Sequence, residues 1–390
     1  MKYILLMAIT VLSLSAEVVQ KFDTFLQTAL KTSPYLHSLS VDIERASQEG
    51  TLLQRYKNPN LELEVSRFSP DVGASENGQR VAILQPVRLW GVGDDKKQLA
   101  NAIGDSAINT YVQKRAAFIK NISLLYVGYT QLKKFLTLAE QTSSIAKTIY
   151  AISSARYEAG TISRGEMLQA KIDYDTVAVE LDSFKLNAQN SLYEIMQYGG
   201  VEEAVSLEDS YNFKVVQTSK ETNPDIAKIT AKKKEALANA SLNSNKVEWL
   251  DVFAEYEKEP AQKIARVGVN IPLALFNTKS EERQLALLSS KKVDLQIKNA
   301  TIKLNAEIKK LQKERVLLHS MQSKNQKLLR DEEELLEMFQ KAYKIANINL
   351  LALQDIKNRV IKSQKALIQI NTALNKNAIY MNYLQGHYND

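Results

Sequence analysis

The sequence predicts a mainly α-helical chain with a small β part, built as two repeats of one plan. Three observations support this fold class: an internal duplication, two very long stretches of helical pattern, and two pairs of strands with alternating apolar and polar residues. Helices this long must lie along other helices, because an ordinary globular domain does not accommodate them. The expected fold therefore combines long antiparallel coiled-coil helices with four amphipathic strands per chain.

The duplication is visible in aligned blocks. The segment Arg80–Val87 (RVAILQPV) recurs as Arg266–Leu273 (RVGVNIPL), and Tyr157 aligns with Tyr343 at the same offset of 186 residues. Each copy has the order helix, two strands, long helix, tip turn, helix. We therefore divide the chain into a first repeat at 17–198, a connector at 199–222, a second repeat at 223–384 and a tail at 385–390.

Residues 1–16 are expected to be a secretory signal peptide. Lys2 precedes an apolar stretch from Tyr3 to Leu12, and small residues follow at Ser13, Ser15 and Ala16. The alternative is an N-terminal core helix. No later segment approaches the roughly 18 to 20 apolar residues that a membrane-spanning helix needs, so a membrane crossing would have to use strands.

The strands of each pair are expected to have one apolar face. Leu61, Leu63 and Val65 alternate with polar residues, and a turn at Ser69–Gln79 leads to the partner strand. The apolar positions of the other three strands are Val81, Ile83, Val87 and Leu89, then Leu250, Val252, Ala254 and Tyr256, then Ala265, Val267, Val269, Ile271, Leu273 and Leu275. Such strands fit a tilted bilayer crossing, with an aromatic girdle at Trp90, Trp249, Tyr256 and Phe276. A soluble two-sided sheet packed on helices is the alternative.

The long helix of the first repeat is expected over Val92–Glu158, which contains no proline. Its apolar residues alternate in steps of three and four, and the second repeat continues this phase from Ile297 to Leu318. A helix over Val92–Glu158 would be about 100 Å long. Four strands per chain leave two unpaired edges, so strands that cross a membrane must close with strands of other copies.

Composition argues against several other functions. The chain has 3 histidines and no cysteine, which disfavours a soft-metal site or a Cys/His catalytic pair. The net charge of +7 is spread along the chain, so nucleic-acid binding is not expected. Gly91-Val92-Gly93 is followed by Lys96 where a dinucleotide-binding loop needs its third glycine. We expect no enzyme activity, no cofactor and no metal.

The chain resembles the TolC-type outer-membrane efflux proteins over essentially its full mature length. The resemblance is carried by Arg156–Thr161 (RYEAGT), by Glu166–Ala170 (EMLQA), and by the Gln-Pro and Ile-Pro strands at 85–86 and 271–272. It implies a homotrimer whose strands form a twelve-stranded outer-membrane β-barrel and whose helices form a tunnel through the periplasm.

Two tips, each a helix-turn-helix at the periplasmic end, are expected to dock an adaptor protein. Gly160 permits a tight turn, while an arginine and an aromatic ring are typical of interaction hot spots. At the second tip Ala346 stands where the family usually has glycine. The alternative is that Gly160 only ends a helix and Arg156 is solvated. The predicted docking residues are Arg156, Tyr157, Gly160, Thr161, Tyr343, Ala346 and Asn347.

Two carboxylates follow the tips and are candidates for an entrance gate. Asp355 matches a position at which the family has an acidic residue, and Glu166 holds a comparable place after the first tip. A ring of carboxylates in a narrow pore attracts cations. An exposed carboxylate at a helix end is the alternative for each.

The sequence thus predicts the outer-membrane channel of an export system, located in the cell outer membrane and extending into the periplasm. Its expected partners are two further copies of the chain, a periplasmic adaptor, an inner-membrane transporter that supplies the energy, and outer-membrane lipid. The alternative is a periplasmic coiled-coil adaptor or a structural or adhesion protein. The exported substrate is not encoded in any recognisable motif.

Overall fold

The computed structural model describes residues 19–69, 71–202, 205–216, 222–345 and 347–387. These residues form two compact units, each built from parts of both repeats. Unit 1 comprises the described parts of Met1–His37, Ala116–Glu221 and Glu307–Asp390, and unit 2 comprises those of Ser38–Arg115 and Thr222–Ala306. The predicted fold class, mainly α with a small antiparallel sheet, is confirmed.

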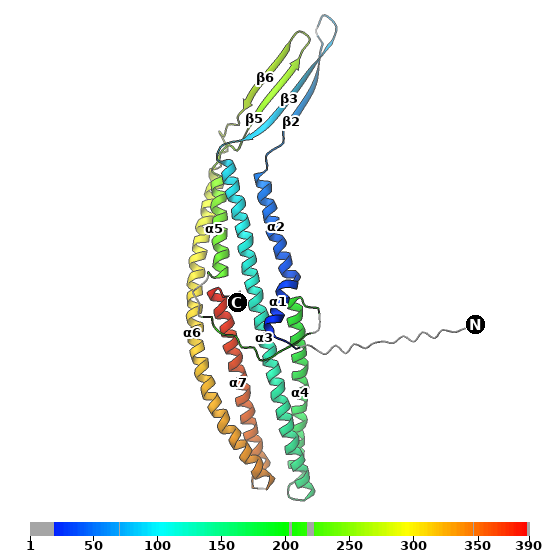
Figure 1. Cartoon of the computed structure of the whole chain (residues 1–390), viewed down its shortest axis with the longest axis vertical. Coiled ribbons are helices and arrows are strands. Elements are labelled where there is room, and N and C mark those ends of the chain that lie inside the picture. The colour runs from blue at the N-terminus through cyan, green and yellow to red at the C-terminus, as the bar shows by residue number, and fades with distance from the viewer. Residues whose placement is uncertain (1–18, 70, 203–204, 217–221, 346, 388–390) are drawn as a thin grey trace, which may run out of the picture. The chain divides into compact units, whose positions relative to one another are not determined.

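Unit 2 contains a four-stranded antiparallel sheet (Figure 1). Its spatial order is β2-β3-β5-β6, so the pairing of β3 with β5 joins the strands of the two repeats. The outer strands β2 and β6 each have one neighbour in the sheet. The four strands are β2 (Asn60–Phe68), β3 (Glu76–Arg88), β5 (Trp249–Lys258) and β6 (Lys263–Asn270).

Two predicted strand boundaries were wrong. The turn placed at Ser69–Gln79 is shorter, because β3 already begins at Glu76. The last strand was expected to continue through Leu275 but ends at Asn270. Pro272 has no N–H to donate to a strand ladder, and the Leu275 N–H donates instead to the carbonyl of Leu273 at 2.9 Å.

The register places the apolar side chains on one face of the sheet. Ile83 lies opposite Leu61 on one side and Ala254 on the other, and Ala254 lies opposite Val267. The aliphatic residues of this row are exposed: Leu61, Ile83 and Val267. The predicted alternation is therefore present, but the part of the chain that the structure describes leaves the apolar face uncovered.

The other elements of unit 2 are helices. Val92 and Leu99 of α3 pack against Leu242 of α5, with Leu53 of α2 beside them. Gly50 of α2 comes so close to α3 that an added Cβ would lie 3.1 Å from the Cβ of Ala100. The helices involved are α2 (Pro34–Gln54), the first part of α3 (Val92–Glu158), α5 (Pro224–Leu242) and the first part of α6 (Ser280–Lys344).

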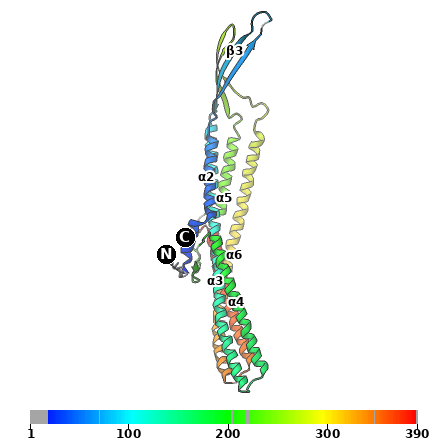
Figure 2. The same ribbon diagram turned by 90° about the vertical axis from the view of Figure 1, so that its right-hand side faces the viewer.

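Unit 1 is formed by the remaining parts of α3 and α6 together with α1 (Phe22–Thr32), α4 (Arg164–Gly199) and α7 (Leu350–Gln385). Figures 1 and 2 show the long helices α3, α4, α6 and α7 running side by side in this unit. Their core includes Ile149 of α3, Ala170 of α4, Leu336 of α6 and Leu353 of α7, all of them buried.

The connector between the repeats is packed against unit 1 where it is described. Its strand β4 (Ser206–Leu207) pairs in parallel with β1 (Val19–Gln20). Phe213 donates its N–H to the side chain of Asn375 at 2.7 Å, and its ring lies 5.4 Å from that of Phe22. The described part of the connector is therefore an ordered part of unit 1.

The predicted signal peptide at 1–16 and the last residues of the tail, 388–390, lie outside the described residues. Among the described helices, none has a stretch apolar and long enough to cross a membrane.

Candidate functional site: the charged sheet face and the helical tips

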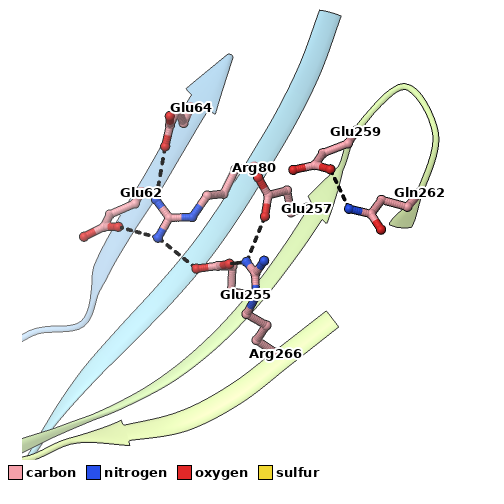
Figure 3. Close-up of polar contacts among 8 residues, drawn as sticks. All are labelled: Glu62, Glu64, Arg80, Glu255, Glu257, Glu259, Gln262 and Arg266. Carbon is pink, nitrogen blue, oxygen red and sulfur yellow. Dashed lines mark hydrogen bonds and ion pairs between the residues drawn. The ribbon is translucent and has the colours of Figure 1, made fainter. Parts of the chain in front are cut away.

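The face of the sheet opposite the apolar one carries a network of charged side chains (Figure 3). Arg80 of β3 reaches carboxylates on both of its neighbouring strands. Its guanidinium lies 3.1 Å from Glu64 and 3.5 Å from Glu62 on β2, and 2.8 Å from Glu255 on β5. An arginine suits this position because its planar fork of donors can serve several carboxylates at once.

A second arginine extends the network to the other edge of the sheet. Arg266 of β6 contacts Glu255 and lies 2.8 Å from Glu257 on β5 (Figure 3). Glu255 therefore accepts from both arginines and links the two halves of the network. We call these six residues the charge ladder: Glu62, Glu64, Arg80, Glu255, Glu257 and Arg266.

The same face contains two glycines that are covered by aromatic rings. A Cβ added to Gly268 would lie 2.6 Å from the ring of Phe253 on the neighbouring strand. A Cβ added to Gly78 would lie 2.6 Å from the ring of Phe68. At both positions the ring of one strand occupies the space that a side chain would need.

The base of the sheet, where the strands meet the helices, is held by cation–π contacts. The guanidinium of Arg88 lies 4.5 Å from the ring of Tyr56 and 5.0 Å from that of Trp249. Trp90 and Phe276 follow the strands at this base and are fully or almost fully exposed. Of the four residues predicted to form an aromatic girdle, Trp90, Phe276 and Tyr256 are exposed, while Trp249 stacks against cations.

Glu248 also lies at this base. It is ion-paired with Lys279 at 2.7 Å and with Lys96 at 3.3 Å. Partial burial by itself would raise the pKa of Glu248, but the two lysines outweigh it and lower the pKa below its ordinary value.

The first tip ends α3 in a Schellman motif. The Thr161 N–H donates to the carbonyl of Arg156 and the Gly160 N–H to that of Tyr157, both at 2.9 Å. Gly160 has φ 70°, and an added Cβ would meet nothing within 4 Å. Glycine is favoured here by backbone conformation and not by crowding.

The second tip repeats this bond 186 residues later. The Asn347 N–H donates to the carbonyl of Ala342 at 3.0 Å, as Thr161 does to Arg156. Ala346, one of the predicted docking residues, lies outside the described residues. The aligned tyrosines differ, because Tyr157 is 40% exposed whereas Tyr343 is 1% exposed.

Arg156 joins the two tips. It donates to the carbonyl of Tyr343 at 3.2 Å, and its guanidinium lies 4.8 Å from the Tyr343 ring. The hydroxyl of Tyr343 in turn lies 2.8 Å from the hydroxyl of Ser153 on α3. Of the predicted docking residues, Arg156 and Tyr343 are thus engaged within the chain, while Tyr157 offers an exposed ring.

The two predicted gate carboxylates have different surroundings. Glu166 forms a capping box with Ser163: each side chain accepts from the backbone N–H of the other, at 3.1 and 3.2 Å. Asp355 on α7 is 64% exposed and pairs with Arg359 one turn later at 2.9 Å. Glu166 therefore has a local structural role, and Asp355 is the more available charge.

Sequence reasoning missed the most buried charge of the tip region. Lys357 of α7 is 1% exposed and forms an ion pair with Asp173 of α4. The sequence contained a signal, because Lys357 stands among the apolar residues Leu353, Ile356 and Val360 at helical spacing. All three are buried in the structure. Among the described residues, no group of three or more His, Asp or Glu side chains is placed to hold a metal ion.

The comparisons with known proteins support the fold and the family. Residues 25–201 match the family described as outer membrane efflux protein. The Campylobacter jejuni CmeC outer membrane channel superposes with a TM-score of 0.77 and 15% identity, over 94% of this chain and 86% of that one. The outer membrane protein VceC from Vibrio cholerae superposes with a TM-score of 0.75 and 13% identity, over 93% of this chain and 95% of that one. No curated protein sequence matches the chain.

Proposed function

Starting from its match to the outer membrane efflux protein family, we propose that this chain is the outer-membrane channel of a multipart efflux system. The match also confirms the resemblance to TolC-type proteins that the sequence indicated. The proposed channel lies in the outer membrane and extends into the periplasm. It conducts substrate passively, from an inner-membrane pump and a periplasmic adaptor to the exterior.

The observation that carries the proposal is the two-faced sheet. One face presents aliphatic side chains that none of the described residues covers, and the other carries the charge ladder. Lipid covers an apolar face of this kind, and a water-filled lumen suits the charged one. The outer strands β2 and β6 need further partners, because hydrocarbon supplies none for their free N–H and C=O groups.

We propose that three copies of the chain close this sheet into a twelve-stranded barrel. The need for other copies follows from the unpaired edges, and the number three follows from the family resemblance. The mass of the purified protein in detergent should be about three times that of the mature chain. A stable, folded monomer would overturn the barrel.

A pair of variants on one strand tests which face meets lipid. Leu63→Arg places a charge on the apolar face of β2, where it costs about 2–4 kcal/mol at the middle of a bilayer. Ser66→Arg places the same charge on the opposite face of the same strand and is the matched control. We expect the first variant to be depleted from the outer-membrane fraction and the second to be retained. Equal insertion of both variants contradicts a lipid-facing role for Leu63.

The rival function is a periplasmic coiled-coil adaptor or a structural or adhesion protein. Cell fractionation separates the two, because a heat-modifiable oligomer in the outer membrane supports the channel and a soluble periplasmic protein supports the rival. Passive conduction is tested in planar bilayers with purified protein alone. Ion current without nucleotide or any second protein is the expected result.

We propose that Asp355 carries the charge of a narrow entrance, with Glu166 second. Asp355→Asn should reduce cation preference in bilayer recordings. Glu337→Gln is a matched control, because Glu337 is also an exposed carboxylate paired with a basic residue one turn later, at 2.6 Å from Lys341. If the two variants change selectivity equally, or if neither does, Asp355 is not the gate.

We propose that the first tip docks the adaptor through Tyr157, Gly160 and Thr161. Arg156 is a poor probe of docking because it also joins the two tips. Tyr157→Ala should lower export, while Tyr380→Ala removes a ring of similar exposure from the far part of α7 and should not. Gly160→Val forces a β-branched residue to φ 70° and should also lower export. Wild-type export by assembled Tyr157→Ala and Gly160→Val proteins would exclude the tip as the docking surface.

A further inference from the structure

The base of the sheet contains an open cavity that the charge ladder does not line. Its volume is about 1300 Å³, and every residue that lines it belongs to unit 2. The walls come from the end of α2 and the residues after it, from the first part of α3, and from the segments around β5 and β6. A cavity this large has room for an organic molecule.

The cavity lies on the same face of the sheet as the charge ladder. Side chains two residues apart along a strand point to the same face. Trp249 and Asp251 line the cavity, and both share the alternation of Glu255 on β5. Asn270 also lines it and shares the alternation of Arg266 on β6. A ligand would therefore reach the cavity from the charged face, which is opposite the face that we propose to meet lipid.

The cavity differs from the ladder in the sign of its charge. Basic residues outnumber acidic residues in its lining. The basic residues are Arg55, Lys57, Lys96, Lys246 and Lys279, and the acidic residues are Glu49, Glu248 and Asp251. The lining thus has a surplus of two positive charges, whereas the ladder has a surplus of two negative charges. Of these two parts of the face, the cavity is the one that favours an anion.

Two cations of the lining are already neutralised. Lys96 and Lys279 share the carboxylate of Glu248, at 3.3 and 2.7 Å. The backbone of Lys279 has φ 54°, in the left-handed region that residues with a side chain rarely adopt. Its N–H donates to the side chain of Asn277 at 3.1 Å. These two lysines therefore shape the cavity, and their charges are balanced before any ligand binds.

Three cations of the lining remain available, because they are exposed and have no carboxylate partner among the described residues. They are Arg55, Lys57 and Lys246. The ammonium of Lys57 lies 5.2 Å from the centre of the Trp249 ring, which also lines the cavity. Of the acidic residues, Glu49 is paired with Arg45 at 3.6 Å, so Asp251 is the lining carboxylate that has no partner in the described part of the chain. A negatively charged ligand would therefore meet three available cations and one available carboxylate.

Part of the lining is apolar. Leu52, Leu273 and Phe276 line the cavity, and all three are exposed. The ring of Trp249 adds an aromatic face. An inorganic anion would leave these side chains in water, whereas an organic anion could cover them while its charged group meets the cations. The lining thus favours a molecule with an anionic group on an apolar or aromatic body.

We infer that this cavity binds amphipathic organic anions from water, with Lys57 and Lys246 at the anionic group and Phe276 at the apolar body. Carboxylates and sulfonates attached to a flat ring system are the chemical class that fits. The inference goes beyond the proposed function, because binding needs neither conduction nor a second protein. In the proposed channel, an anion held here would lie beside anything that passes along the charged face.

Fluorescence anisotropy with two dyes tests the sign of the charge. Carboxyfluorescein and tetramethylrosamine share one ring system, but the first is an anion and the second is a cation. The full chain is purified in an uncharged detergent and titrated into each dye. We expect saturable binding of carboxyfluorescein and binding of tetramethylrosamine that is weaker by about ten-fold or more. Naphthoate, a soluble aromatic carboxylate, should displace carboxyfluorescein.

A pair of double variants tests the position of the site. Lys57→Gln with Lys246→Gln removes two cations of the lining and should weaken the binding of carboxyfluorescein about ten-fold. Lys298→Gln with Lys303→Gln removes the same charge from exposed positions of α6 in the same unit and is the matched control. If the first pair weakens binding no more than the second, the dye is attracted to a basic protein in general and the site is refuted.

A pair of single variants tests the apolar contact. Phe276→Ala removes an exposed ring from the lining and should weaken the binding of carboxyfluorescein. Trp90→Ala removes a similarly exposed ring that does not line the cavity and should leave binding unchanged. Thermal unfolding in the same detergent separates a loss of binding from a loss of fold. Unchanged binding in Phe276→Ala would overturn the place assigned to the apolar body.

The remaining outcomes separate this inference from the proposed function. Absence of saturable binding, or equal binding of the two dyes, overturns the anion site. Displacement of carboxyfluorescein by phosphatidylglycerol but not by naphthoate assigns the cavity to a lipid and overturns the soluble ligand. Each of these results leaves the channel standing if the protein has a three-copy mass and conducts ions. Conversely, a monomeric and non-conducting protein that binds carboxyfluorescein through Lys57 and Lys246 keeps the site and overturns the channel.

Discussion

Two ion pairs between the same two helices should differ greatly in their contribution to stability. Lys357 and Lys365 both lie on α7, and their partners Asp173 and Glu180 both lie on α4. The side chains of the first pair are 1 and 21% exposed, and those of the second are 37 and 41% exposed. Burial is therefore the main variable between them.

The change to make is Lys357→Met, which keeps the length of the side chain and removes its charge. Removing one partner of a buried pair costs about 3–5 kcal/mol because the other charge is left without compensation. Asp173 can regain some water, so we expect the lower end, about 3 kcal/mol. Lys365→Met should cost at most about 1 kcal/mol, as for other solvated pairs.

Hydrogen exchange of the backbone amides of α7 measures this difference. A loss of 3 kcal/mol increases local opening about 100-fold, whereas 1 kcal/mol increases it about five-fold. In Lys357→Met, the protection of the Ile356–Val360 amides against hydrogen exchange should therefore fall about 100-fold. In Lys365→Met, the protection of the amides near residue 365 should fall much less. The double variant Lys357→Met with Asp173→Leu should recover most of the protection. Equal losses in the two single variants would refute the reasoning from burial.

Two further predictions concern the sheet and its base. Gly268→Val should destabilise the assembled protein by about 1–3 kcal/mol, because its Cβ would collide with the ring of Phe253, and thermal unfolding in detergent measures this. Gly104→Ala, where an added Cβ meets nothing within 4 Å, is the control and should be neutral or stabilising. The pKa of Glu248 is lowered in the folded state, so its contribution to stability is present at neutral pH and is lost as the pH falls below about 4. As the pH falls below about 4, the Glu248→Gln variant should therefore lose less stability than the natural chain. Identical acid-denaturation curves for the two proteins would contradict this assignment.

The sequence was most informative where structure depends on local pattern. The long helix α3 spans Val92–Glu158, as predicted, because uninterrupted steps of three and four residues specify a helix without reference to the rest of the fold. The end of β6 was misjudged because alternation continues past Asn270, although Pro272 had already removed a ladder donor.

The contacts of the candidate site were harder to predict from the sequence, because they join residues that lie far apart in the chain. The repeat aligned Tyr157 with Tyr343 and suggested equal roles, yet one is exposed and the other buried. Which of two equivalent residues faces inward depends on how the helices of both repeats pack. Arg156 donates to the carbonyl of Tyr343, which lies 187 positions later in the sequence. The pairing of β3 with β5, and with it the charge ladder, depends on contacts of the same kind.

The charge ladder has a consequence for anything that passes along it. Its six residues comprise four glutamates and two arginines, so the ladder of each chain has a surplus of two negative charges. The guanidinium groups hold the carboxylates to the strands and leave them little freedom to wrap around an ion. In the proposed channel such a wall acts as a weak ion exchanger. It enriches small cations near its surface and, because every carboxylate already has a partner, releases them again easily.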